Sequence, residues 1–281
     1  MIMTPPIPEP IRFETLLSLS WTVFRRNWIV ALPPVIAMGL IVAGYAAFIS
    51  LLIVGTLAHG GMENASPSFG GALVIAAVLF IVAAFVVILW SYAAMYGMAD
   101  AAWAKGTTTF ADGFTAFRTR AGALIVAGIG VIGIAIAAVI LALPTLGLAI
   151  LALPLVTMYI APSVVTGGRD GFTAIAESFR LVRRFFGTSA IALLVLLGIH
   201  YGISMLASFS ILPFEFAILP TLGQTTAPHF PPISVMVLAG LWFILALLAA
   251  QAYTGFYTIA IVGLYRSLYA QPSAAPPLGR F

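Results

Sequence analysis

Apolar residues fall into six long runs separated by short polar segments, and this pattern predicts six transmembrane helices. The runs cover residues 28–54, 71–99, 122–143, 146–166, 188–212 and 232–264. Each run has at least the roughly 20 residues that an α-helix needs to cross the hydrocarbon core of a bilayer. The runs do not alternate between apolar and polar positions, as the strands of a membrane β-barrel do. Because lipid offers backbone N–H and C=O groups no partner, we expect every run to be helical.

A short amphipathic stretch at 171–186 precedes the fifth run. Its apolar side follows helical spacing and comprises Phe172, Ile175, Phe179, Val182 and Phe186. Its other side carries charged residues, namely Glu177, Arg180, Arg183 and Arg184. A helix with an aromatic stripe and a basic face is typical of the membrane interface.

Two related stretches predict an internal repeat. The pentapeptide Asp-Gly-Phe-Thr-Ala occurs at 112–116 and again at 170–174, and SWTVFRRNW at 20–28 lines up with SFRLVRRFF at 178–186. The first and middle copies have shorter aromatic stripes, which are Leu17, Trp21, Phe24 and Trp28, and Phe110, Phe114 and Phe117. We therefore expect three units, each an interfacial helix followed by a transmembrane hairpin, at about 11–103, 109–166 and 171–264.

The charges predict one orientation. With six spans, all twelve Lys and Arg residues and six of the eight acidic residues fall on one side, and only Glu63 and Glu215 fall on the other. The positive-inside rule then places both termini in the cytoplasm. We expect one six-span domain at 1–269, and a disordered tail at 270–281 that is rich in Pro and Ala.

Composition narrows the possible functions. Only 7% of residues are charged and 62% are hydrophobic, which no water-soluble surface allows. The absence of Cys excludes disulfides and thiolate sites. No sequence motif of a hydrolase, a nucleotide-binding loop or a zinc protease is present, so we expect no enzymatic activity, no cofactor or metal, and no nucleic-acid partner.

Polar residues inside the spans are a second set of candidates, because each is costly in lipid unless it has a partner. They are Tyr92, Tyr96, Asp100, His200, Gln251, Thr254 and Tyr257. They favour either helix packing or a polar cavity between the second, fifth and sixth spans, as a small-solute or lipid transporter would need. We expect the structural role, with Asp100 close enough to the surface to be solvated.

The segment LPTLGLAILALPLVTMYIAPSVVTGGRDGFTAIAESFRLVRRFFG at 143–187 resembles bacterial six-span proteins grouped with the membrane domain of glycerophosphoryl diester phosphodiesterases. The positions that carry the resemblance are Pro144, Gly147, Pro162, Ala174, Ser178 and Leu181. The family often has an acidic residue where this chain has Thr166 and Gly167, and its catalytic barrel has no counterpart here. The resemblance implies a fold and a bacterial inner-membrane location, and it implies no activity.

The function expected from the sequence is non-enzymatic. Basic interfacial helices would bind or organise membrane lipid, a protein partner or a second copy of the chain, through Arg25, Arg26, Arg180, Arg183 and Arg184. The simpler alternative is that these residues only set the topology.

Overall fold

The computed structural model describes residues 13–58, 67–209 and 232–269, and these residues form helices without any strand. Six helical segments are long and apolar enough to cross a membrane: Trp28–Ala58, Phe69–Lys105, Phe110–Ala142, Leu148–Val165, Phe186–Leu206 and Ile233–Tyr269. The chain is therefore an all-α polytopic membrane protein with six spans, as its apolar runs predict. The expected tail at 270–281 and the last residues of the run 188–212 lie outside the described residues.

The first hairpin follows an amphipathic helix. Helix α1 (Phe13–Arg26) leads through the 3-10 turn η1 (Trp28–Ala31) into α2 (Leu32–Ala58), and α3 (Pro67–Lys105) returns. Pro33 and Pro34 lie in the first turn of α2, directly after the change from 3-10 to α geometry. Proline is tolerated there because the first turn of a helix needs no N–H donors.

The second hairpin differs from the prediction at its start. Helix α4 (Phe110–Ala142) is continuous, so its amphipathic start is not a separate interfacial helix, and a capping box of Thr109 and Asp112 begins it. The returning span is divided into α5 (Leu148–Thr157) and α6 (Ile160–Val165). Pro162 explains the division, because it has no N–H to donate to the carbonyl of Met158.

The third hairpin is preceded by a separate short helix. Helix α7 (Gly171–Arg184) ends at Phe185, which leaves the helical conformation with φ −120° and ψ 42°. Helix α8 (Phe186–Ser208) then begins, and α10 (Ile233–Tyr269) is the closing span. Asp170 caps α7 by accepting a hydrogen bond of 2.9 Å from the N–H of Thr173.

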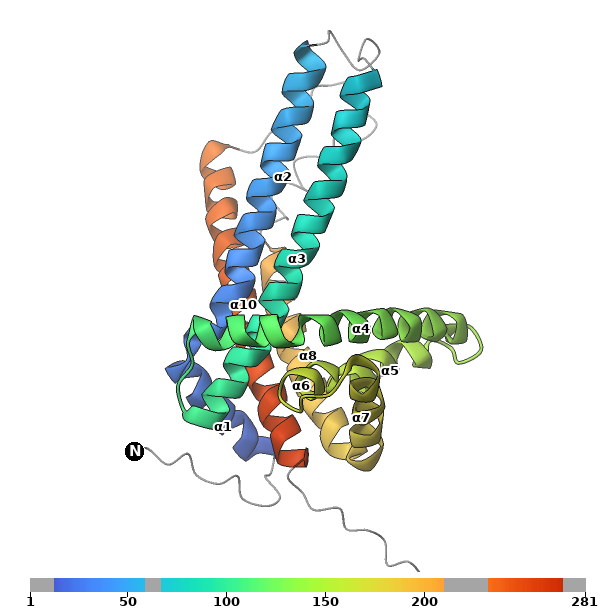
Figure 1. Cartoon of the computed structure of the whole chain (residues 1–281). Coiled ribbons are helices and arrows are strands. Elements are labelled where there is room, and N and C mark those ends of the chain that lie inside the picture. The colour runs from blue at the N-terminus through green and yellow to red at the C-terminus, as the bar shows by residue number, and fades with distance from the viewer. Residues whose placement is uncertain (1–12, 59–66, 210–231, 270–281) are drawn as a thin grey trace, which may run out of the picture.

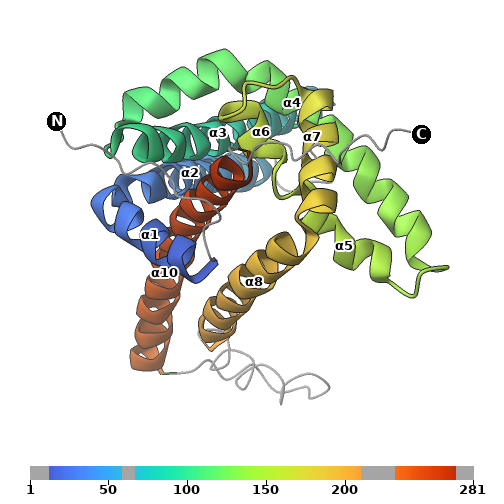
Figure 2. The ribbon, with the colours of Figure 1, turned by 90° about the horizontal axis from the view of Figure 1, so that it is seen from below.

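The three hairpins diverge from a common base (Figures 1 and 2). We define the base as α1, η1, the α6–α7 segment 160–184, and residues 90–105, 110–127 and 252–269. Close approaches hold it together. A Cβ on Gly97 of α3 would lie 2.3 Å from Cβ of Ala116 on α4, and one on Gly255 of α10 would lie 2.9 Å from that of Ala31.

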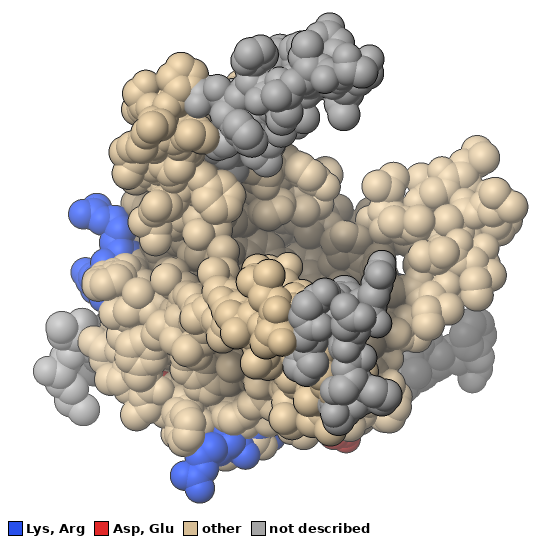
Figure 3. Space-filling model, turned by 90° about the horizontal axis from the view of Figure 1, so that it is seen from above, with Lys and Arg blue, Asp and Glu red and all other residues tan. Residues whose placement is uncertain are grey.

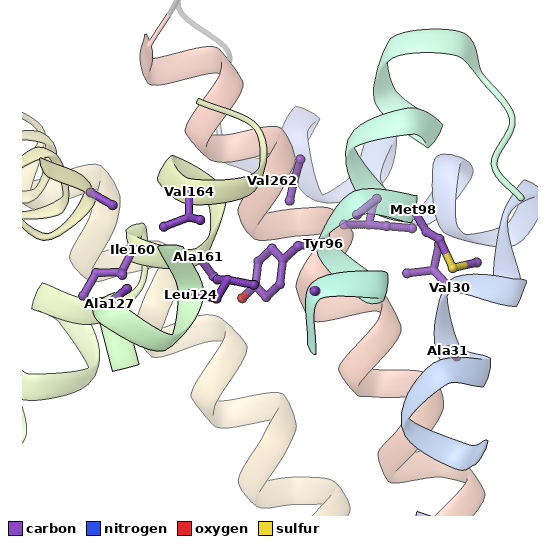
Figure 4. Packing of buried hydrophobic residues seen from close by; sticks show 14 of the residues in the cluster. Val30, Ala31, Tyr96, Met98, Leu124, Ala127, Ile160, Ala161, Val164 and Val262 are labelled. Carbon is purple, nitrogen blue, oxygen red and sulfur yellow. The ribbon is translucent and has the colours of Figure 1, made fainter. Parts of the chain in front are cut away.

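The hydrophobic core lies in the base. Figure 4 shows Tyr96 of α3 directed toward Leu124 of α4 and Ala161 of α6, with Val262 of α10 nearby. An adjoining cluster joins Tyr159 and Leu196 to the last turns of α10. Each hairpin thus follows an amphipathic segment, and the superposition of the three units stays a prediction.

Candidate functional site

Among the described residues, the charged side chains lie in the base and its margins. Seen from above, the diverging hairpins present uncharged residues around a hollow, and Lys and Arg appear only at the edge (Figure 3). Burying a charge in lipid is costly, so this separation marks the base as the layer that meets water and lipid headgroups.

Helix α7 divides into a buried and an exposed side. Its small residues Ala174 and Ser178 are fully buried, while Phe172 is 67% and Phe179 47% exposed. Val182 of the predicted apolar stripe is buried in the core. The exposed arc contains both aromatic and basic side chains.

The charge pattern placed Glu177 on the charged side of α7, but the structure buries its side chain. Its carboxylate is 5% exposed and accepts a 2.7 Å hydrogen bond from Arg180, and Nε of Arg169 lies 3.5 Å away. Arg169 also donates to the hydroxyl of Tyr269 at 2.8 Å. A buried carboxylate needs such partners, because desolvation would otherwise cost several kcal/mol. The contact between Arg169 and Tyr269 was not predicted from the sequence, because the two residues are 100 positions apart in it.

The guanidinium groups of α7 gather in one surface depression, which is lined by Phe179, Arg180, Arg183 and Arg184. Arg184 also lies over the ring of Phe185, 4.9 Å from its centroid. Arginine presents a planar set of donors that matches phosphate oxygens, and an aromatic neighbour favours contact with the apolar region just below. The depression is therefore chemically suited to a phosphate at an apolar boundary.

The other amphipathic segments show the same division. On α1, Trp21 and Trp28 are 52% and 57% exposed, and Arg25 and Arg26 are exposed beside them. Phe24 departs from the predicted stripe, because it is buried. Its ring packs edge-on against Phe256 of α10, with centroids 6.1 Å apart. On α4, Phe110 and Phe114 are exposed and Phe117 is partly buried.

Asp100 is partly exposed and has a partner that was not predicted from the sequence. Its carboxylate pairs with Arg266 at 2.6 Å, and the two side chains are 28% and 27% exposed. The pair joins the ends of α3 and α10. Asp100 and Arg266 both directly follow or lie close to the predicted cytoplasmic ends of their spans. Their opposite charges at a similar depth could therefore have predicted an ion pair. Trp103 strengthens the same contact by donating to the carbonyl of Ile259 at 2.8 Å.

The intramembrane candidates are brought together only in part. The rings of Tyr92 and Tyr96 lie 4.9 Å apart, and Tyr257 is close enough to interact with both. His200 is exposed on α8, and its ring lies 5.7 Å from that of Tyr253.

Two of the candidates line different cavities. Tyr92 lines one between α3, α4 and α6, while Gln251 lines a groove between α2 and α10. Thr254 is partly buried and donates to the carbonyl of Ala250, within its own helix. The alternative of a polar cavity between the second, fifth and sixth spans, as a transporter would need, stays a prediction.

Within the part of the chain that the structure describes, no three His, Cys, Asp or Glu residues gather as a metal site would require. No protein-family model, curated protein or solved structure matches this chain. The resemblance to six-span membrane proteins grouped with glycerophosphoryl diester phosphodiesterases therefore stays a prediction. What the described residues do show is six helices that are long and apolar enough to cross a membrane.

Proposed function

We propose that this protein is a non-enzymatic membrane protein that binds anionic lipid at the membrane surface through α7, with α1 in a supporting role. The observation that carries the proposal is the exposed arc of α7. It presents Phe172 and Phe179 next to Arg180, Arg183 and Arg184, while the opposite side of the helix is buried.

Charge and apolar contact favour lipid over a soluble ligand. A cation at an anionic membrane surface contributes about 1 kcal/mol, and three adjacent cations act together. The exposed Phe and Trp rings add apolar area where a headgroup meets hydrocarbon. Glu177 neutralises part of the charge on Arg180 and Arg169, and Arg183 and Arg184 add two further cations beside them.

The test is the triple variant Arg180→Gln, Arg183→Gln, Arg184→Gln. Wild type and variant are reconstituted in nanodiscs of equal phosphatidylglycerol and phosphatidylcholine and extracted gently. Native mass spectrometry then counts the lipids that each retains. We expect the variant to lose its preference for the anionic lipid by about tenfold, which corresponds to roughly 1.4 kcal/mol shared by the three residues.

A matched variant with Lys at the same three positions controls for charge. It should retain the anionic preference, because the positive charge remains even though the planar donor set is lost. Equal lipid retention by the Gln and wild-type proteins would contradict the proposal and leave these residues as topology determinants. A protein released in place of lipid would identify a partner-binding surface instead.

In the proposed orientation the base lies on the cytoplasmic side of a bacterial inner membrane, as the positive-inside rule suggests. Because the chain has no Cys, single cysteines report on topology without interference. Thr107→Cys should resist an impermeant thiol reagent in intact cells, whereas Ser66→Cys should react. Labelling at Thr107 from outside would reverse the orientation.

Transport is the alternative function. It would be favoured if liposomes containing the protein showed flux of a small solute or lipid. Asp100→Asn or His200→Ala should then abolish this flux, and the triple Gln variant of α7 should preserve it.

A further inference from the structure

A cavity of about 470 Å³ lies where α3, α4 and the α5–α6 span meet. Of its fourteen lining residues, only Tyr92 and Thr157 have polar side chains. The hydroxyl of Thr157 donates within its own helix, to the carbonyl of Leu153. The cavity is comparable in volume to known small-ligand pockets, and its wall is almost pure hydrocarbon.

The crossing of α3 and α4 gives the cavity the form of a wedge. The two helices touch in the base, where a Cβ on Gly113 would lie 3.0 Å from Cβ of Ala94, and they diverge strongly from there (Figure 1). The closed end is formed by Ile160 and Ala161 of α6. The open end is flanked by half-exposed apolar side chains, which are Phe85, Ile88, Ile129 and Ile132.

Tyr92 places one directed polar group in this wedge. The rings of Tyr92 and Tyr96 lie 4.9 Å apart, and the hydroxyl of Tyr92 is a group that can donate a hydrogen bond to an acceptor in the wedge. Its side chain is 43% exposed and lines the cavity. Tyr92 stands two turns from Asp100, or about 12 Å along α3, and therefore just inside the charged layer. Ester carbonyls of a lipid occupy this depth and lack donors of their own.

A cation stands on the same face of α4 as the cavity. Arg118 precedes Ile125 by seven residues, so the two side chains share one helix face about 10 Å apart. Arg118 is exposed, and it makes no ion pair within the described ranges. Arg118, Tyr92 and the apolar wedge thus follow one another in the same order as the phosphate, the ester and the acyl chain of a phospholipid.

We infer that this wedge binds one anionic phospholipid, with its phosphate at Arg118, an ester carbonyl at Tyr92 and an acyl chain between α3 and α4. Water is a poor occupant, because an apolar cavity offers it too few hydrogen bonds. A second helix keeps a diameter of about 10 Å along its whole length, whereas a flexible chain fits a narrowing wedge. The inference rests on the proposed lipid binding and adds a site that is separate from α7.

The test fills the wedge in the full-length protein. Ile129→Trp adds bulk inside the cavity, and Ile140→Trp adds it to an equally exposed position of α4 outside the cavity. Each protein is incubated with dioleoyl phosphatidylglycerol in detergent, and native mass spectrometry counts the lipids retained. We expect Ile129→Trp to lower occupancy of the tightest site at least fivefold and Ile140→Trp to leave it unchanged. Ile132→Trp repeats the test if Ile129→Trp does not fold.

The polar contacts are tested separately. Arg118→Gln should bring retention of phosphatidylglycerol at this site down to that of phosphatidylcholine, and Tyr92→Phe should lower retention of both lipids alike. Equal occupancy in the Ile129→Trp and Ile140→Trp proteins would overturn the inference. So would a change from dimer to monomer at unchanged lipid occupancy, which would assign the wedge to a second copy. The α7 variant leaves the wedge intact, so the two proposals can fail independently.

Discussion

The base of this protein and its diverging hairpins are both apolar, yet they are built in opposite ways. In the most apolar stretch of α3 no residue is buried inside the chain, whereas 39% are buried in the α5–α6 span. Toward the base, α3 changes to small and polar residues, and Ala93, Met98 and Ala99 are fully buried there. The base is packed by the protein itself, and the hairpins depend on lipid.

This difference has a physical cause. In lipid, apolar side chains gain nothing by leaving the solvent, so helices associate through close backbone approach and polar contacts. Both are concentrated in the base, as the contacts Gly97–Ala116 and Asp100–Arg266 illustrate. The hairpins have few such contacts and diverge, and the wedge-shaped spaces between them are open to lipid.

The largest effect should come from removing the buried carboxylate of the base. Glu177→Gln leaves the side chains of Arg169 and Arg180 without their anionic partner and should cost about 3 kcal/mol. The measurement is the thermal unfolding midpoint in one detergent. Glu14→Gln on α1, where the side chain is exposed, is the control and should change little. Equal midpoints for both variants would mean that the network does not stabilise the base.

A pair of glycines compares the two regions directly. Gly97→Ala forces its Cβ against that of Ala116 and should cost about 2 kcal/mol by overpacking. Gly133→Ala lies in the hairpin, where nothing stands within 4 Å of a new Cβ, and should be neutral or slightly stabilising. Thermal unfolding of both variants checks this. A similar loss at both positions would show that the hairpin of α4 is packed after all.

Hydrogen bonding in the base should give a smaller effect. The hydroxyl of Tyr159 shares a 2.8 Å hydrogen bond with that of Ser189, and both are buried. Tyr159→Phe should cost about 1 kcal/mol, because Ser189 loses its partner. Tyr201→Phe removes a hydroxyl from a tyrosine that is 67% exposed and should cost less. Chemical denaturation would contradict this ranking if Tyr201→Phe proved the more harmful.

The smallest effect concerns the edge of the base. The N–H of Thr173 donates to the carboxylate of Asp170 and lowers its pKa. The stabilisation of α7 is therefore complete above the ordinary pKa of the carboxyl, and it is lost as pH falls through the lowered pKa of the folded state. Asp170→Ala should unfold earlier than wild type at pH 7, and the difference should vanish in strong acid. Asp170→Asn, which still caps the helix, should show no such pH dependence.

Much of the fold could be predicted from the sequence, because membrane insertion depends on local properties. Twenty apolar residues must be helical in lipid wherever they pack, so the six spans follow from composition alone. The amphipathic character of 171–186 is local as well, and Asp170 and Phe185 begin and end that helix where the pattern indicated. The stripe of Phe110, Phe114 and Phe117 predicted a separate interfacial helix, and this was wrong, since nothing between Phe110 and Ala142 interrupts the hydrogen bonds of α4.

The partners of the polar residues were decided by the tertiary structure. Helical periodicity tells which residues share a face, and it does not tell what that face contacts. Glu177 was therefore assigned to the charged side of its helix, although packing against Arg169 and Arg180 buries it. Asp100 pairs with Arg266, which is 166 residues away in the sequence. The divergence of α3 and α4 likewise depends on a contact between Gly97 and Ala116, whose closeness no local pattern encodes. The positions of the spans and of the charged residues follow from whether each residue prefers lipid or water. Burial and the wedge depend on which helices contact each other.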